Sequence, residues 1–423
     1  MNFLKFKNHI YLLILIILFL VGCAQKENKN KIVLWTGMNT DKELEMLHNM
    51  GKEFENTTGI KVDIIPIPFS DLQNKFQIAA PAKQGPDLIT GPQDWAGIFA
   101  AAKLISPLEE YVPEEEQKKF VSVSIEGASY ENTLYAIPLS FECVALIYNK
   151  DFVSKPPSTM EELIKEAKNL TITTGEGDKK KYERYGFLVT PNDFFVVFPI
   201  FSGRGTCVFN NISDPTSLGL NNDGAKEAAR IIYNMRDFTE DGFIPEGITG
   251  DRVLGTFMEG KTAMIINGPW AINELDKVGR NYGISPLPPF EDENIPKPFV
   301  GILGIMLNRF AKNPEAAVKF MLFMNNKENQ VKIYKALNRI PARIEALQAP
   351  EVQADEKIMG FYHSAENGIP LPNMPVMSSV WDPMVQSLTL ITTEKRDDPD
   401  KFIEEQLNTA VKRIQNNIKR LLR

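Results

Sequence analysis

Short apolar segments alternate with amphipathic ones from Lys31 onward, and this alternation limits the fold more than any other feature. The strand-like segments are 31–35 (KIVLW), 60–67 (IKVDIIPI) and 85–90 (GPDLIT), and the helix-like segments are 41–59, 71–80 and 94–104. Strands that alternate with helices predict an α/β fold with a mostly parallel sheet. In such sheets ligands bind beyond the carboxyl ends of the strands, which here means the loops 35–41 and 90–95.

The same alternation continues through the rest of the chain. Further strands are expected at 135–139, 144–150, 185–189 and 262–267, and further helices after Ser158, near Asn192 and at 222–238, 252–259, 314–326, 328–337 and 398–423. Ser158 and Glu161 have the spacing of a capping box. About 400 residues follow the first 22, more than one core normally serves, so two domains or one two-lobed body is expected.

The first residues have the pattern of an export signal. Lys5 and Lys7 precede an apolar run from 10 to 21, which is shorter than the ~20 residues of a membrane-spanning helix. The residues Leu-Val-Gly-Cys at 20–23 resemble the lipobox of bacterial lipoproteins. We therefore expect a signal peptide at 1–22 and a lipidated Cys23 that begins a polar tether to residue 30, with an ordinary signal and a chance cysteine as the alternative.

Composition and motifs exclude several classes of function. A net charge of −7 without a long basic run argues against a nucleic-acid partner. No nucleotide-binding, hydrolase or metalloprotease motif is present, and the only histidines beyond the signal, His48 and His363, lie far apart, so no cofactor and no metal are expected. A glycosidase needs only two carboxylates, so this class of enzyme remains an alternative function. Cys143 and Cys207 form either one disulfide or two unpaired core thiols.

An ordered set of sequence blocks carries a family resemblance. The blocks are KIVLW, KEFENTTGIKV, QGPDLITGPQDWAG, LYAIPLSFECVALIYNKD, EGKTAMIINGPWAI, KPFVGILG and LPNMPVMSSVW. In order and spacing they resemble the maltose/maltodextrin-binding proteins, and more generally the carbohydrate-binding extracellular solute-binding proteins of ABC importers. The likeness extends from about residue 31 to residue 421.

The resemblance implies a bilobed fold that closes on an oligosaccharide without catalysis. The N-terminal lobe would comprise 31–140 and 303–339, and the C-terminal lobe 141–302 and 340–423. The implied partners are a two-subunit permease and its ATPase. The protein would be a monomer, anchored through Cys23 on the extracytoplasmic side of the membrane.

Matching positions imply a set of ligand-binding residues. Trp270 and Trp381 match tryptophans that line the cleft, where aromatic rings cover the C–H faces of a sugar while carboxylates accept bonds from its hydroxyl groups. The matching polar and remaining aromatic residues are Asp94, Glu142, Asp193, Phe195, Asn39 and Asp41. Several of these residues also have an alternative to ligand binding. The tryptophans would pack in the core, and the acids would be solvated surface charges. Thr40, Asp41 and Asp193 would cap or begin a helix.

The chain departs from the family pattern at four positions near this site. Gly91 stands where the family pattern has a tryptophan, and Trp95 stands where it has an arginine. Asp382 replaces a tyrosine of the pattern, and Val385 replaces a later arginine. Trp95 is therefore expected to replace the stacking lost at Gly91. A gluco-oligosaccharide is the first expectation for the ligand, and a non-sugar or cationic solute is the alternative.

Overall fold

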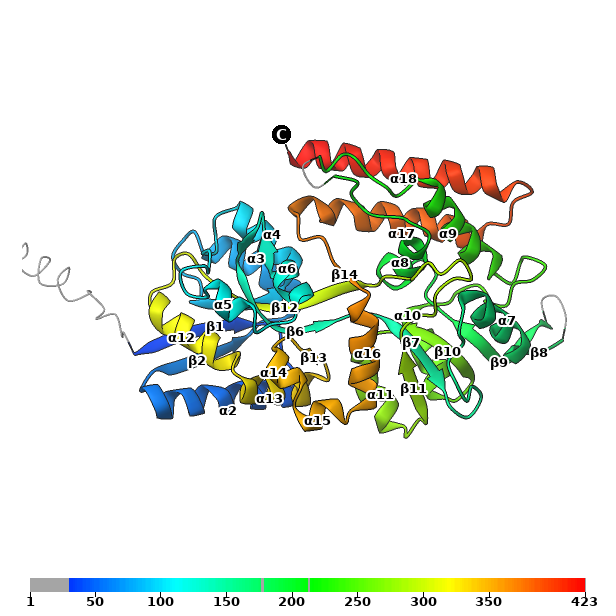
Figure 1. Ribbon diagram of the computed structural model, residues 1–423. Helices are drawn as coiled ribbons and strands as arrows, with labels where there is room; N and C mark the ends of the chain where they lie inside the picture. Colours follow the sequence, from blue (N-terminus) through cyan, green and yellow to red (C-terminus); the bar gives the residue numbers. More distant parts are fainter. Residues whose placement is uncertain (1–29, 176–178, 212–213, 423) are drawn as a thin grey trace, which may run out of the picture.

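Two mixed β-sheets, each with helices packed against it, form the two lobes of the computed structural model (Figure 1). The structure describes residues 30–175, 179–211 and 214–422. The predicted signal peptide, Cys23 and nearly all of the predicted tether lie outside this part of the chain.

The first lobe is built on a sheet with the order β13-β6-β12-β3-β1-β2, and β14 pairs with β12. Its strands are β1 (Lys31–Thr36), β2 (Lys61–Pro66), β3 (Leu88–Pro92), β6 (Ala136–Glu142), β12 (Phe299–Leu307), β13 (Ile340–Pro341) and β14 (Ile369–Pro370). Its helices are α2 (Asp41–Thr58), α3 (Phe69–Ala79), α4 (Gln93–Ala101), α5 (Glu114–Gln117), α6 (Ser122–Ala128), α12 (Pro314–Met324), α13 (Lys327–Leu337), α14 (Ile344–Leu347) and α15 (Pro350–Gln353). A small hairpin joins β4 (Ser129–Tyr130) to β5 (Thr133–Leu134).

The second lobe is built on a sheet with the order β11-β7-β10-β9-β8. Its strands are β7 (Ala145–Asn149), β8 (Ile172–Thr174), β9 (Lys181–Leu188), β10 (Thr262–Asn267) and β11 (Tyr282–Ser285). Its helices are α7 (Met160–Leu170), α8 (Phe194–Gly203), α9 (Asp223–Asn234), α10 (Gly250–Met258), the 3-10 turn η2 (Pro269–Ala271), α11 (Ile272–Lys277), α16 (Glu356–Glu366), the 3-10 turn η3 (Pro375–Met377), α17 (Ser378–Thr393) and α18 (Pro399–Leu421).

The chain passes between the lobes more than once. It leaves the first sheet at Glu142 and enters the second at Ala145, and it returns between Ser285 and Phe299. α16 packs against β11 and β7 of the second sheet and also against β6 and β13 of the first. The helices that follow it, α17 and α18, pack on α8 and α9, so the end of the chain completes the second lobe (Figure 1).

The α/β class is confirmed, but the expectation of a mostly parallel sheet is wrong. β1 pairs parallel with β2 and β3, and β10 with β9, whereas β12 runs antiparallel to both β3 and β6. Chain returns between the lobes bring β12 into the first sheet from a distant part of the sequence. A strand added in this way is not bound by the right-handed crossover that makes successive βαβ strands parallel.

Two local expectations also need correction or refinement. Thr159, not Ser158, caps α7, because the Thr159 hydroxyl accepts the Glu162 N–H at 3.1 Å. Cys143 is fully buried and Cys207 is half-buried, and both are free thiols. Within the described residues, no helix combines the length and the apolar character needed to cross a membrane.

Candidate functional site

The loops at the carboxyl ends of three parallel strands gather several predicted residues of the first lobe. β1, β2 and β3 run side by side in one direction and end at Thr36, Pro66 and Pro92. The loop after β1 contains Asn39, and α4 begins directly after β3 and carries Asp94. These side chains therefore share one edge of the sheet, where parallel α/β sheets bind their ligands.

Asn39 and Asp41 flank a helix cap. The Thr40 hydroxyl accepts the Glu43 N–H at 3.3 Å, and the Glu43 carboxylate accepts the Thr40 N–H at 3.0 Å, which completes a capping box. Asn39 and Asp41 are both exposed. Capping thus falls to Thr40, and the side chains of Asn39 and Asp41 remain accessible to a ligand.

Asp94 is a half-buried carboxylate in the first turn of α4. Burial raises its pKa above the usual value, and the backbone N–H groups of Asp94 and Trp95 oppose that shift. Its neighbour Gln93 is buried and bonds to β12 through both ends of its side-chain amide. The Gln93 Nε2 donates to the Val300 carbonyl at 3.2 Å, and the Gln93 Oε1 accepts the Ile302 N–H at 2.6 Å. These bonds hold the start of α4, and with it Asp94, against β12.

Trp95 lies inside the first lobe and not on its surface. Only 5% of it is exposed. Phe69, the first residue of α3, stacks on it with ring centroids 4.9 Å apart and an interplanar angle of 24°. A Cβ atom at Gly91 would lie 2.4 Å from the indole Cε3, so the indole occupies the space that a side chain at position 91 would fill. Direct stacking of Trp95 on a ligand stays a prediction, and its burial leaves little of the ring to contact one.

Glu142 lies at the end of β6, where the chain leaves the first sheet. Burial raises its pKa, and the charge of Arg339 opposes the shift. The Arg339 Nε lies 2.9 Å from the Glu142 Oε2, an ion pair without hydrogen-bond geometry, and 22% of the Glu142 side chain is exposed. A carboxylate desolvated in this way can accept further hydrogen bonds from a ligand.

Asp193 is the N-cap of α8. Its Oδ1 accepts the N–H groups of Phe195 at 3.1 Å and Val196 at 3.3 Å. Burial raises its pKa although the side chain still reaches solvent, and the two backbone bonds oppose the shift. Both cap bonds use Oδ1, so Oδ2 remains available to a ligand. Capping and ligand binding are therefore compatible at this residue.

Aromatic rings from four elements form one cluster where the start of β12 meets the second lobe. Phe195 of α8 lies 6.4 Å from Trp270 of η2 and 6.0 Å from Phe299 of β12, measured between ring centroids. Trp381 of α17 packs edge-on against Phe299 at 6.3 Å. Phe299 is fully buried, Phe195 and Trp381 are half-buried, and Trp270 is 43% exposed. The cluster therefore has a core end at Phe299 and a solvent-facing end at Trp270.

Trp270 is the most exposed ring of this cluster. A Cβ atom at Gly268 would lie 2.2 Å from the indole, so the ring folds back over the Gly268 backbone. The indole thus lies against the backbone of its own turn, while 43% of it is accessible. A flat apolar ligand surface can stack on an exposed indole.

The start of β12 brings the separate groups together. Phe299 joins the aromatic cluster, Val300 and Ile302 bind Gln93 beside Asp94, and Gly301 pairs with Glu142 in the sheet. Four consecutive residues of a strand span about 10 Å. Asp94, Glu142 and the cluster with Trp270 and Trp381 are thus arranged around one short piece of strand.

Two residues beside this site were missed by sequence reasoning. Phe69 is 55% exposed although aromatic, and it follows the end of β2 as Asp94 follows that of β3. Its position in a strand-to-helix loop was a usable signal. Arg339 lies in the connection between α13 and β13, far from Glu142 in the sequence, and no local pattern indicated their pairing.

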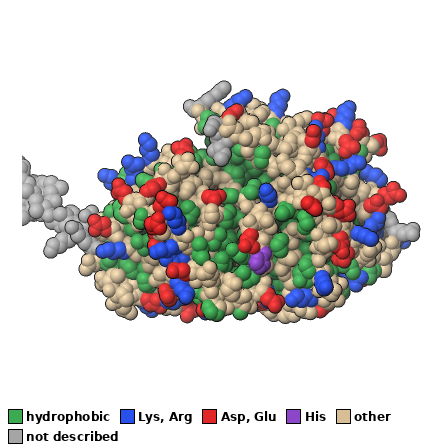
Figure 2. All heavy atoms as spheres, viewed as in Figure 1, with side chains coloured by type: hydrophobic (Ala, Val, Ile, Leu, Met, Phe, Trp, Pro, Cys, Tyr) green, Lys and Arg blue, Asp and Glu red, His purple; other side chains and the backbone are tan. Residues whose placement is uncertain are grey.

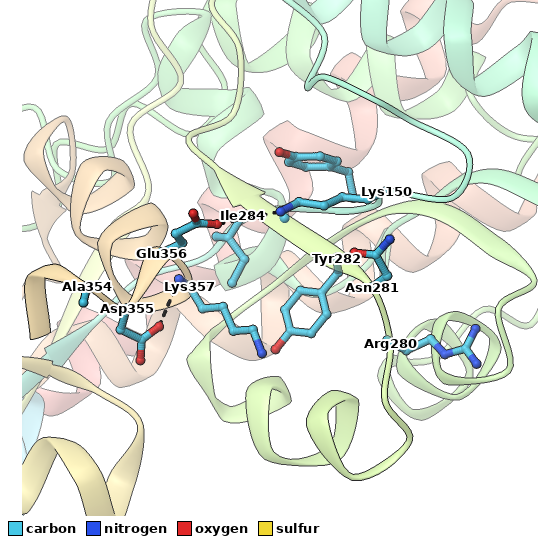
Figure 3. A pocket seen from close by; sticks show the side chains of 11 residues that line it. Lys150, Arg280, Asn281, Tyr282, Ile284, Ala354, Asp355, Glu356 and Lys357 are labelled. Atoms are coloured by element: carbon cyan, nitrogen blue, oxygen red, sulfur yellow. Dashed lines mark hydrogen bonds and ion pairs between the residues drawn. The ribbon is translucent and has the colours of Figure 1, made fainter. Parts of the chain in front are cut away.

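A separate pocket lies between β11 and the start of α16 (Figure 3). It has a volume of about 400 Å³ and contains none of the predicted residues. Lys150 pairs with Glu356 at 3.8 Å, Lys357 pairs with Asp276, and the Asp276 carboxylate also accepts the Tyr282 hydroxyl at 2.8 Å. Most of its charges are therefore matched within the protein. In the space-filling view, acidic and basic side chains are interspersed over both lobes, and hydrophobic ones show across the middle of this face (Figure 2).

Two α/β lobes joined by several chain crossings, with aromatic and carboxylate side chains around the crossing strand β12, define the class of bilobed binding proteins. The chain matches the family described as bacterial extracellular solute-binding protein over residues 49–360, and it belongs to that family. This finding confirms the family predicted from the sequence blocks.

Individual relatives cover nearly the whole chain. A galactooligosaccharide-binding protein of Bacillus subtilis is 28% identical over 412 residues, 93% of each chain. A maltooligosaccharide ABC transporter solute-binding lipoprotein of Streptococcus pneumoniae is 27% identical over 88% of this chain and 86% of its own. The crystal structure of a cyclo/maltodextrin-binding protein complexed with maltotetraose superposes with a TM-score of 0.83 at 31% identity, covering 93% of this chain and 99% of that one. These relatives are named as binding proteins and not as enzymes.

Proposed function

We propose that this protein binds an oligosaccharide between its lobes and delivers it to the permease of an ABC importer. The observation that carries the proposal is the half-exposed indole of Trp270 at the end of an aromatic cluster that adjoins desolvated carboxylates. A sugar has C–H patches on its faces and hydroxyl groups around its edge. Exposed aromatic rings stack on the C–H patches, and carboxylates accept hydrogen bonds from the hydroxyl groups.

Every predicted ligand-binding residue except the buried Trp95 contacts the ligand in this proposal. Trp270 and Trp381 stack on the ligand with Phe195, and the acids accept its hydroxyl groups. The acids are Asp94 and Asp41 from the first lobe, Glu142 from the crossing and Asp193 from the second lobe, with Asn39 as a further polar contact. Because these groups belong to both lobes, a bound sugar favours the closed arrangement.

We also propose the lobe boundaries that the family resemblance implies, 31–140 with 303–339 and 141–302 with 340–423. The strands support most of these limits, since β1, β2, β3, β6 and β12 belong to the first sheet and β7 to β11 to the second. Two short strands of the segment 340–423, β13 and β14, pair with the first sheet, so this segment contributes to both lobes. The first residues of β12 and the end of β6 belong to the crossings on either side of these limits.

The location and partners follow from the same proposal. Cys23 carries the lipid anchor, and residues to 30 tether the lobes outside the membrane. The residues at 20–23 support this assignment, as does the similarity to a lipoprotein of an ABC transporter. The permease and its ATPase read the closed form of a monomer, and the protein itself performs no catalysis.

Calorimetric titration tests the proposed function. The protein without residues 1–23 is titrated with maltose, maltotriose, a longer maltodextrin, a galactooligosaccharide and unrelated oligosaccharides. We expect one-to-one binding of at least one oligosaccharide. The absence of any binding across the panel contradicts the proposal and moves attention to cationic and other non-sugar solutes. Formation of shorter products from a labelled oligosaccharide would indicate a glycosidase instead.

A further inference from the structure

The exposed ring of Phe69 is a feature of the first lobe that the proposed site does not yet use. A large aromatic side chain is 55% exposed at the first position of α3, at the same sheet edge as Asn39 and Asp94. Its ring stacks on Trp95, which in turn packs near Phe99 with centroids 6.2 Å apart. Phe69 is therefore the outer member of a column of rings that is anchored in the core of the first lobe.

Two glycines make room for this column. A Cβ atom at Gly37 would lie 3.0 Å from the Cδ2 of Phe69, and one at Gly91 would lie 2.4 Å from the Cε3 of Trp95. Gly37 belongs to the loop after β1, and Gly91 to β3. A larger residue at either position would displace a ring, so both glycines keep the Phe69 and Trp95 rings stacked close to the strand ends.

We propose that Phe69, supported by Trp95, is the sugar-stacking platform of the first lobe. The buried indole fixes the orientation of the phenyl ring, and the phenyl ring makes the contact. This inference rests on the proposed oligosaccharide binding and deepens it, because it places one aromatic platform on each lobe, Phe69 on the first and Trp270 on the second.

Platforms on both lobes restrict the chemistry of the ligand. In this proposal Phe69 and Trp270 cover opposite faces of one sugar ring, which must then offer an apolar surface on both faces. A gluco-configured pyranose does so, because its equatorial hydroxyl groups leave axial C–H bonds on either side. In a galacto-configured ring the axial 4-hydroxyl group makes one face polar. The site is therefore matched to a glucan more closely than to a galactan.

Binding measurements on three variants test this inference. We expect Phe69→Ala to weaken the binding of maltotriose about tenfold, equivalent to about 1.4 kcal/mol. Phe69→Tyr keeps the ring and should stay within about twofold of the wild type. Ile78→Ala is the matched control, because Ile78 is 75% exposed on the same helix and lies about 13 Å further along its axis. It should leave the affinity unchanged.

Each outcome of the titrations decides a separate point. An unchanged affinity of Phe69→Ala, in a protein whose wild type binds the glucan, overturns the platform and leaves the proposed function standing. An equal loss in Phe69→Tyr and Phe69→Ala also overturns it, because the ring would then not be what binds. Tighter wild-type binding of a galactotriose than of maltotriose overturns the preference for glucans. A wild type that binds no oligosaccharide overturns the proposed function itself, and this inference with it.

Discussion

Replacing Trp270 by alanine tests the solvent-facing end of the aromatic cluster. With 43% of a side chain that presents about 250 Å² in all, Trp270 exposes about 110 Å² to solvent. A ligand that stacks on the exposed part of the indole covers about half of that area, and the remainder stays in contact with solvent. At about 25 cal/mol per Å² this burial contributes ~1.4 kcal/mol, which corresponds to about tenfold in affinity.

We therefore expect Trp270→Ala to weaken binding of the best oligosaccharide at least tenfold, because edge and dispersion contacts of the ring add to the area term. Calorimetric titration measures this directly. Ile172→Ala is the matched control, since Ile172 is also 43% exposed but lies on β8, the outer edge strand of the second sheet. It should bind as the wild type does. Near-normal affinity in both Trp270→Ala and Trp381→Ala would refute the assigned site.

Three further substitutions probe the carboxylates. Asp94→Asn should stabilise the ligand-free protein at neutral pH while weakening sugar binding. Burial raises the pKa of Asp94 in the folded state above 3.8, so at neutral pH the ionised carboxylate lowers the free energy of unfolding. This cost disappears as the pH falls from the folded-state pKa toward 3.8, the value of the unfolded state. Thermal unfolding of both proteins against pH should show the gain at neutral pH, and no gain there would contradict it. Arg339→Ala should raise the pKa of Glu142 further, since the opposing cation is lost, and should move the acid limb of the binding–pH profile to higher pH, whereas Arg339→Lys should restore it. Asp87→Ala should lower the free energy of unfolding by about 3 kcal/mol, because it leaves the backbone N–H groups of Val33, Lys312 and Asn313 without the carboxylate that accepts them; Asp41→Ala, at an exposed position, is the control for chemical denaturation.

Local patterns were sufficient where an element depends on its own residues. The segment 262–267 was predicted as a strand, and β10 has these bounds. The helix expected at 314–326 is α12 (Pro314–Met324), and the helix expected at 328–337 is α13. Their apolar spacing and end signals, such as Pro314 at the start of α12, lie within one short window of sequence.

Features that depend on distant segments were not predictable in the same way. The antiparallel place of β12 beside β3 depends on where the chain re-enters the first lobe. The contact of Arg339 with Glu142 joins the connection before β13 to the end of β6, and no spacing rule links them. The prediction that Trp95 replaces the stacking lost at Gly91 rests on its place beside that position, yet Trp95 lies beneath Phe69. Only the packing between α3 and α4 determines which of the two rings is outermost.

The chemistry of the assigned residues restricts the ligand further. Asp94, Glu142 and Asp193 are carboxylates whose pKa values burial raises, and Arg339, the cation paired with this set, is engaged with Glu142. A ligand with its own carboxylate or phosphate group would add like charge to groups that are already costly to ionise. A neutral ligand rich in hydroxyl groups instead supplies donors to these acceptors without adding charge. The same residues that favour a sugar therefore disfavour acidic sugars.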